Sequence, residues 1–325
     1  MTADPFLDSP AETPALPGRG RRWLRRAKWT GLLLLLALVL YYPVGMILVH
    51  RINDDPAFTP ISTPEGGSKA VALAAALIQR EVGNTSWPAN DPFFLPGAAL
   101  DNMPNFQIGI QEGLRRFATE MADQIGRARG SSSADQDLTD ARGALNYAPD
   151  RWVWDPSVSW WPTAGSEDQY LAAMRSLLKY NERLSRGQAA FEPRADNLMT
   201  TLDRIGKDLG AASNTIDLQI DQFSGDWIDL HADDKFYRTK GLLYAFGLLL
   251  RDLGVDFKDV IAEKGATNVW QRMVDSMLEG ASLQPIVVMN GSPNAMLQPN
   301  HLAAQGFYLL RARTQLEEIT DILQK

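Results

Sequence analysis

The chain has 325 residues, of which 45% are hydrophobic and 22% are charged, and these values exclude a disordered or collagen-like protein. It contains no cysteine, which excludes disulfides, zinc–thiolate sites, iron–sulfur clusters and thiol nucleophiles. The formal net charge is −7, so no nucleic-acid partner is expected.

Charge is distributed unevenly around one long uncharged segment. Residues 1–28 carry six basic and three acidic residues, residues 29–49 carry no charge, and residues 50–325 have a net charge of −10. The leucine-rich uncharged segment matches the ~20 residues that a helix needs to cross a bilayer. We therefore predict a transmembrane anchor at 29–49, in contact with the lipid bilayer, with Tyr41 and Tyr42 well inside it.

The flanking charges predict the orientation of this anchor. Basic residues favour the cytoplasmic side, so residues 1–28 are expected as a short, partly disordered cytoplasmic tail of a bacterial inner-membrane protein. A cleaved signal peptide is the alternative, but the apolar run is longer than usual and no small-residue cleavage site follows it. Residues 50–64 contain three prolines and predict an extended linker that lifts the domain off the membrane. Residues 65–325 then form a periplasmic domain.

Helical patterns dominate this domain. Thr63 followed by proline is typical of a helix N-cap. Apolar positions at three- and four-residue steps predict helices over about 68–82, 105–129, 135–146, 166–186, 193–223, 233–252, 257–262, 267–278 and 299–323. Strand signals are nearly absent. The predicted fold class is all-α, with one N-terminal transmembrane helix followed by a multi-helix periplasmic bundle that has long ordered loops at 83–104 and 147–163.

Two of the predicted helices have distinctive apolar patterns. Apolar residues recur at near-heptad steps from Leu198 to Phe223, and such a seam requires a partner helix along its length. Residues 242–250 make their helix apolar on nearly every side, which predicts the central, buried helix of the domain.

Several short motifs are distinctive. They are Asn84-Thr85-Ser86-Trp87-Pro88-Ala89-Asn90-Asp91-Pro92-Phe93-Phe94, Leu100-Asp101-Asn102-Met103-Pro104-Asn105-Phe106-Gln107, Gly126-Arg127-Ala128-Arg129-Gly130 with Asp135 and Asp137, Lys179-Tyr180-Asn181-Glu182-Arg183-Leu184, Arg194-Ala195-Asp196-Asn197-Leu198 and Asp208-Leu209-Gly210. Because of these motifs, the chain resembles an uncharacterised family of proteobacterial membrane proteins, domain of unknown function 2333, over nearly its whole length. The resemblance implies an envelope protein with one N-terminal span and implies no activity, cofactor or catalytic residue.

The first candidate site is the loop predicted at 83–104. Asp91, Asp101 and Asn102 lie in a long segment of turn-forming residues of the kind that lines a ligand- or partner-binding cleft. Turn chemistry and capping of the helix that begins near Asn105 explain the same residues without a ligand.

The second candidate site is the tryptophan-rich loop with Trp152, Trp154, Trp160 and Trp161. Exposed indoles would bind the sugar rings of peptidoglycan, lie at the membrane interface or anchor a protein partner. Burial of the indoles in the helical core is the favoured interpretation, because large aromatic side chains are usually buried.

The third candidate site is an acidic cluster that contains Asp226, Asp229, His231, Asp233 and Asp234. Carboxylate and imidazole ligands suit calcium or a transition metal. The spacing does not match an EF-hand loop, and the favoured interpretation is that Asp233 caps the following helix.

No nucleophile elbow, phosphate-binding loop or zinc-protease motif occurs in the sequence, and no cofactor is expected. The first hypothesis is therefore a non-enzymatic envelope scaffold that binds a protein partner or a second copy of itself. The alternative hypothesis is a periplasmic cell-wall glycan-binding protein or hydrolase that uses the tryptophan-rich loop.

Overall fold

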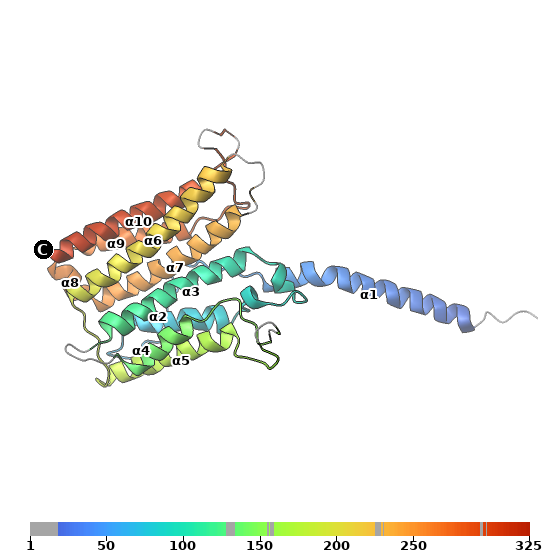
Figure 1. Cartoon of the computed structure of the whole chain (residues 1–325), viewed down its shortest axis with the longest axis horizontal. Helices are drawn as coiled ribbons and strands as arrows, with labels where there is room; N and C mark the ends of the chain where they lie inside the picture. Colours follow the sequence, from blue (N-terminus) through green and yellow to red (C-terminus); the bar gives the residue numbers. More distant parts are fainter. Residues whose placement is uncertain are drawn as a thin grey trace, which may run out of the picture.

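The computed structural model describes residues 19–127, 134–154, 156, 159–224, 229, 231–292, 295–296 and 298–325. In this part of the chain it has no strand and ten α-helices: α1 (Arg19–Val49), α2 (Lys69–Ile78), α3 (Asn102–Glu120), α4 (Gln136–Leu145), α5 (Ser166–Ser185), α6 (Ala195–Phe223), α7 (Ala232–Asp256), α8 (Lys258–Glu263), α9 (Thr267–Ala281) and α10 (His301–Gln324). α1 projects as a rod from one end of a bundle that the other helices form (Figure 1). The predicted all-α class is confirmed, while most of the predicted cytoplasmic tail, residues 1–18, lies outside the described residues.

The N-cap of the first helix of the domain lies later in the chain than the sequence predicts. Gly66 has a φ of +80°, and a left-handed residue cannot continue a right-handed helix. Ser68 is the N-cap of α2 instead, because its hydroxyl accepts a hydrogen bond from the backbone N–H of Val71 at 3.1 Å. The prediction of an N-cap at Thr63 is therefore wrong.

α7 lies at the centre of the bundle, where its backbone nearly touches that of α3. A Cβ atom added at Gly241 would lie 2.0 Å from the carbonyl oxygen of Phe106, and one added at Gly109 would lie 2.1 Å from that of Arg238. Residues 242–250 are all buried, since α2, α3 and α9 pack around them. The prediction of a central, buried helix is confirmed.

α6 finds the partner for its apolar seam within the chain. Leu198, Leu202, Leu209 and Ile216 are buried, and α10 packs along α6 (Figure 1). The seam weakens at its end, where Phe223 is 37% exposed. The predicted partner helix therefore exists, and a second protein is not needed to cover this seam.

Residues 50–64 contain no helix and are bonded to the surface of the domain. The ammonium group of Lys240 lies 2.6 Å from the carboxylate of Asp54. Farther along, Nη2 of Arg251 donates to the carbonyl oxygen of Phe58 at 2.8 Å. These bonds hold the segment against α7, so residues 50–64 form a strap along the domain, and the expected distance between domain and membrane stays a prediction.

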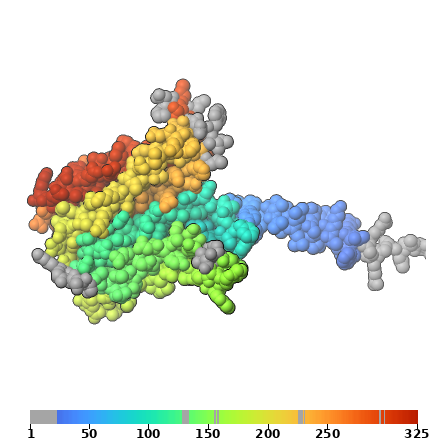
Figure 2. Space-filling model, viewed as in Figure 1, coloured from blue at the N-terminus to red at the C-terminus, as the bar shows by residue number. Residues whose placement is uncertain are grey.

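α1 is the one helix in the described ranges that is long and apolar enough to cross a membrane. The most apolar 18-residue window within its Trp23–Val49 stretch has a mean hydropathy of 2.6, and none of that window is buried. The C-terminal part of the helix nonetheless docks on the domain (Figure 2). The hydroxyl of Tyr41 donates to the carbonyl oxygen of Phe94 at 3.0 Å, and the hydroxyl of Tyr42 donates to that of Phe93. Both tyrosines thus join the helix to the bundle.

Candidate functional sites

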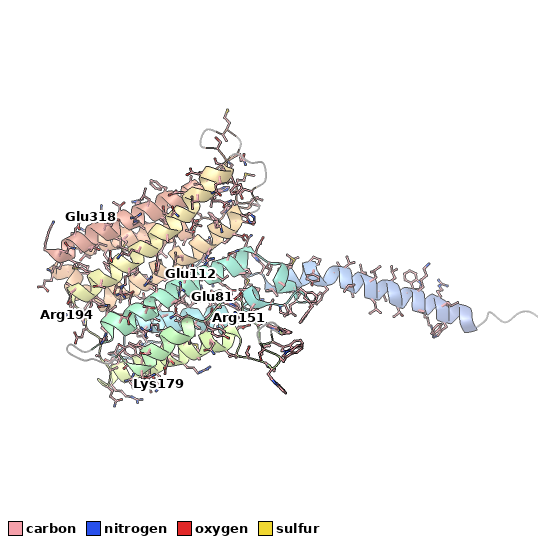
Figure 3. The ribbon with its side chains drawn as sticks, in the orientation of Figure 1. Glu81, Glu112, Arg151, Lys179, Arg194 and Glu318 are labelled. Atoms are coloured by element: carbon pink, nitrogen blue, oxygen red, sulfur yellow. The ribbon has the colours of Figure 1, made fainter. Side chains whose placement is uncertain are left out.

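Two loops that carry candidate residues are joined at the end of the bundle from which α1 leaves. One loop connects α2 to α3, and the other is the tryptophan loop (residues 147–163), in which Figure 3 labels Arg151. The buried indole of Trp87 donates to the carbonyl oxygen of Pro149 at 2.8 Å. The buried amide of Asn90 donates to the carbonyl oxygen of Arg151 at 2.9 Å. These bonds fix the tryptophan loop against the first loop.

The first loop does not gather its candidate carboxylates into one group. Asp91 is partly buried against Gly97, and its pKa is raised first by burial and then by the negative charge of Glu167. Asp101 is the N-cap of α3, since its carboxylate accepts from the backbone N–H of Asn102 at 2.7 Å. Capping therefore accounts for Asp101, whereas the side-chain oxygen of Asn102 is buried without a hydrogen-bond partner among the described residues, and Asp91 lies beside the other loop.

The tryptophan loop exposes most of its indoles. Trp160 and Trp161 are 81% and 80% exposed, and Trp154 is 46% exposed, so burial in the core is wrong for these three side chains. The loop lies beyond the ends of the helices, where no core is available to receive them (Figure 1). Trp152 is partly buried and packs edge-to-face on Phe94, with ring centroids 5.7 Å apart.

In the third candidate site, Asp229 acts as a structural acceptor. It accepts hydrogen bonds from the side chains of Gln219 at 2.8 Å and Asn290 at 3.0 Å, and from the backbone N–H of His231 at 3.1 Å. Burial tends to raise the pKa of Asp229, but these donors outweigh it and lower the pKa. The imidazole of His231 is exposed and lies 3.7 Å from the carboxylate of Asp234.

Asp233 is not the N-cap of α7, because it lies inside the first helical turn. Its pKa is raised first by burial and then by the charges of Asp101 and Asp234. Asn105 donates to Asp234 at 2.7 Å, so tertiary packing joins the first and third candidate sites. No group of three histidine or acidic side chains in the described residues is arranged to hold a metal ion, and Asp226 lies outside them.

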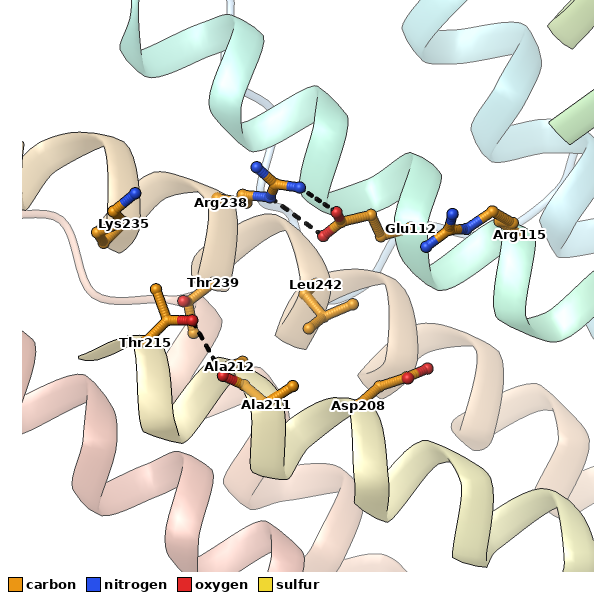
Figure 4. A pocket seen from close by; sticks show the side chains of 10 residues that line it. All are labelled: Glu112, Arg115, Asp208, Ala211, Ala212, Thr215, Lys235, Arg238, Thr239 and Leu242. Carbon is orange, nitrogen blue, oxygen red and sulfur yellow. Dashed lines mark hydrogen bonds and ion pairs between the residues drawn. The ribbon is translucent and has the colours of Figure 1, made fainter. Parts of the chain in front are cut away.

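Sequence reasoning missed a polar cleft of about 410 Å³ between α3, α6 and α7 (Figure 4). Two ion pairs border it. The guanidinium of Arg238 on α7 binds the carboxylate of Glu112 on α3. The carboxylate of Asp208 on α6 accepts from Nε of Arg116 at 2.6 Å. The pairs connect the three helices on the surface above the buried α3–α7 contact.

Two further cations line the same cleft. Arg115 and Lys235 form no ion pair with the residues that the structure describes, and the hydroxyls of Thr215 and Thr239 lie nearby (Figure 4). This combination suits an anionic group such as a carboxylate. None of the lining side chains is a histidine or an activated nucleophile. The residues come from α3 and from the distant pair α6 and α7, and the cleft depends on how these helices pack, so no local sequence signal could have found it.

A comparison with known protein families assigns the chain to one of them. The family described as "Uncharacterized protein conserved in bacteria (DUF2333)" matches residues 65–226 and 221–325, which together cover most of the chain. The chain belongs to this family. The DUF2333 match begins after the strap and includes both loops and the cleft, and it confirms the resemblance inferred from the motifs. No curated protein and no solved structure matches the chain.

Proposed function

We propose that this protein is a non-enzymatic scaffold of the bacterial envelope, tethered to the inner membrane by α1. The N-terminus lies in the cytoplasm, where its basic residues are favoured, and α2–α10 lie in the periplasm. The docking of α1 on the domain carries this proposal. Besides the tyrosine hydrogen bonds, a Cβ atom added at Gly45 would lie 2.3 Å from Cγ of Pro96, so the helix fits closely against the bundle. This close fit supports a helix that stays in the folded protein over a signal peptide that is removed.

The cleft between α3, α6 and α7 is the surface that fits a partner best. The apolar seam of α6 is already covered by α10, so a partner meets polar surface instead. Arg115 and Lys235 offer two cations to an acidic segment of a protein partner.

A reporter fusion tests the membrane topology. Alkaline phosphatase joined after Lys325 should be active in intact cells, and the purified protein should retain its N-terminal residues. An inactive phosphatase with an active cytosolic reporter, or a product trimmed after α1, would contradict the proposal.

Photo-crosslinking tests the partner surface. A benzoylphenylalanine placed at Lys235 should yield one adduct of constant mass in intact cells, and the same group at exposed Glu263 on α8 should not. Lys235→Glu should remove an adduct formed from a crosslinker at Arg115, because it repels an acidic partner. Equal adducts from Lys235 and Glu263, or a hydrolytic activity in the purified chain, would count against the scaffold.

Exposure of Trp160 and Trp161 favours cell-wall glycan binding as a second candidate function. Flat, solvent-exposed aromatic side chains are suited to stacking against sugar rings. Purified protein should then be retained on peptidoglycan, and Trp160→Ala with Trp161→Ala should abolish retention. Equal retention of both proteins would remove this candidate.

A further inference from the structure

The apolar surface of α1 continues past the point where the helix docks on the domain. Val44, Ile47 and Leu48 are 49%, 76% and 66% exposed, and no charged residue occurs between Lys28 and Arg51. A contiguous apolar helix surface of this kind is stable in lipid and not in water. If α1 crosses the membrane, the hydrocarbon layer around it therefore extends to about Leu48.

Distances along α1 place the docking point below the membrane surface. A rise of 1.5 Å per residue makes Trp29 to Leu48 about 28 Å long, which is close to the ~30 Å hydrocarbon thickness. By the same rise Tyr42 is about 20 Å from Trp29, so about 10 Å of hydrocarbon lies beyond it. If the Lys28 side chain extends back to the cytoplasmic surface, α1 can lie about one turn, or ~5 Å, farther toward the periplasm. Tyr42 still lies inside the hydrocarbon layer in that case.

The part of the domain that meets α1 at this depth is suited to lipid. We term residues 92–100 the lip; it consists only of proline, phenylalanine, leucine, glycine and alanine. Phe93 is 83% exposed and Phe94 is 47% exposed. Their carbonyl oxygens accept from Tyr42 and Tyr41, and three further hydrogen bonds join backbone groups within the lip. These bonds satisfy part of the lip backbone, which is the condition that hydrocarbon imposes on non-helical chain.

The tryptophan loop extends this apolar surface beside the lip. Trp152 contacts Phe94, and the indole of Trp154 donates to the carbonyl oxygen of Trp160 at 3.3 Å. Figure 2 shows the base of α1 in blue, the neighbouring lip in teal and the tryptophan loop in green at the same end of the molecule. Exposed indoles such as those of Trp160 and Trp161 are favoured at the headgroup level of a bilayer.

We propose that the lip and the tryptophan loop enter the periplasmic leaflet of the membrane that α1 crosses. The lip lies in the outer hydrocarbon, and the indoles of the loop lie among the phospholipid headgroups. The contact holds the bundle in one orientation relative to the membrane. This inference rests on the proposed crossing of the membrane by α1.

Depth-dependent quenching in the full-length chain tests the inference. Because the chain has no cysteine, single variants can each carry one environment-sensitive fluorophore. The positions are Leu36→Cys in α1, Ala98→Cys on the exposed lip, Trp160→Cys and Val255→Cys. Val255 is 42% exposed and lies in the last turn of α7, next to α8, which Figure 1 shows at the end of the bundle away from α1. The labelled proteins are reconstituted in phosphatidylethanolamine–phosphatidylglycerol vesicles that contain shallow or deep doxyl-lipid quenchers.

The label at Ala98 should lose fluorescence and shift to the blue, as the label at Leu36 does, and the label at Trp160 should respond to the shallow quencher. The label at Val255 should respond to neither. A response at Leu36 with none at Ala98 would overturn the inference and leave the membrane anchor intact. No response at Leu36 would overturn the anchor as well. A response at Ala98 with none at Trp160 would remove the indoles from the membrane and favour the glycan alternative.

Discussion

Replacing Gly241 with alanine tests the contact between α3 and α7 around which the bundle is built. The added methyl group would lie 2.0 Å from the carbonyl oxygen of Phe106 and 3.1 Å from the backbone nitrogen of Ile110. Both neighbours are backbone atoms, so no side-chain rotation relieves the overlap. An ordinary contact between nonbonded atoms is about 3.5 Å, so the two helices would have to separate by more than about 1 Å.

That separation would loosen the buried residues on both helices. Overpacking a core lowers the free energy of unfolding by about 1–3 kcal/mol and sometimes more. The higher helix propensity of alanine offsets up to about 1 kcal/mol of this loss. Because the overlap involves backbone, we expect Gly241→Ala to lower the free energy of unfolding by about 3 kcal/mol. In a domain of this size, such a loss lowers Tm by about 6–12 °C.

Gly143→Ala is the matched control. Gly143 lies in α4, and nothing lies within 4 Å of a Cβ atom added there. This substitution should raise stability by about 0.5–1 kcal/mol through helix propensity alone. Thermal unfolding of both full-length variants in one detergent, followed by circular dichroism, makes the comparison. If Gly241→Ala leaves Tm unchanged or raises it as Gly143→Ala does, α3 and α7 are not in backbone contact and the reasoning is refuted.

Two further predictions concern buried charges. Lys240→Met leaves the Asp54 carboxylate without its buried cation and should lower the free energy of unfolding in urea by about 3 kcal/mol. Adding Asp54→Leu to this variant should restore most of the lost stability. An equal loss in the single and double variants would show that the ion pair is not the cause. For Asp137, burial tends to raise the pKa, but hydrogen bonds from Lys179 and Arg183 outweigh it and lower the pKa. A lowered folded-state pKa contributes stability that is present above the unfolded pKa and is lost as pH falls through the folded pKa. Stability of the native chain should therefore fall more steeply than that of Asp137→Asn below about pH 4, and parallel pH profiles would contradict this assignment.

Local sequence signals predicted most helices because helix formation depends on residues within a few turns of one another. The periodicity in residues 193–223 and the apolar run at 242–250 correspond to α6 and α7. The misplaced cap at Thr63 shows the limit of such signals, since the conformation of Gly66 ends any helix that would begin there. Local motifs also identified the candidate residues, but their contacts and exposure could be seen only in the structure.

Composition and periodicity by themselves determined the all-α class and the long apolar segment, and the short motifs carried the resemblance to the family. Tertiary structure alone decided that α10 covers α6, that Asn105 bonds to Asp234 and that the indoles of Trp160 and Trp161 are exposed. It also decided that Tyr41 and Tyr42 bind the domain. The reason is physical: helix propensity and hydrophobic pattern are properties of neighbouring residues. A contact between distant segments depends instead on how whole helices pack, and no stretch of sequence encodes that alone.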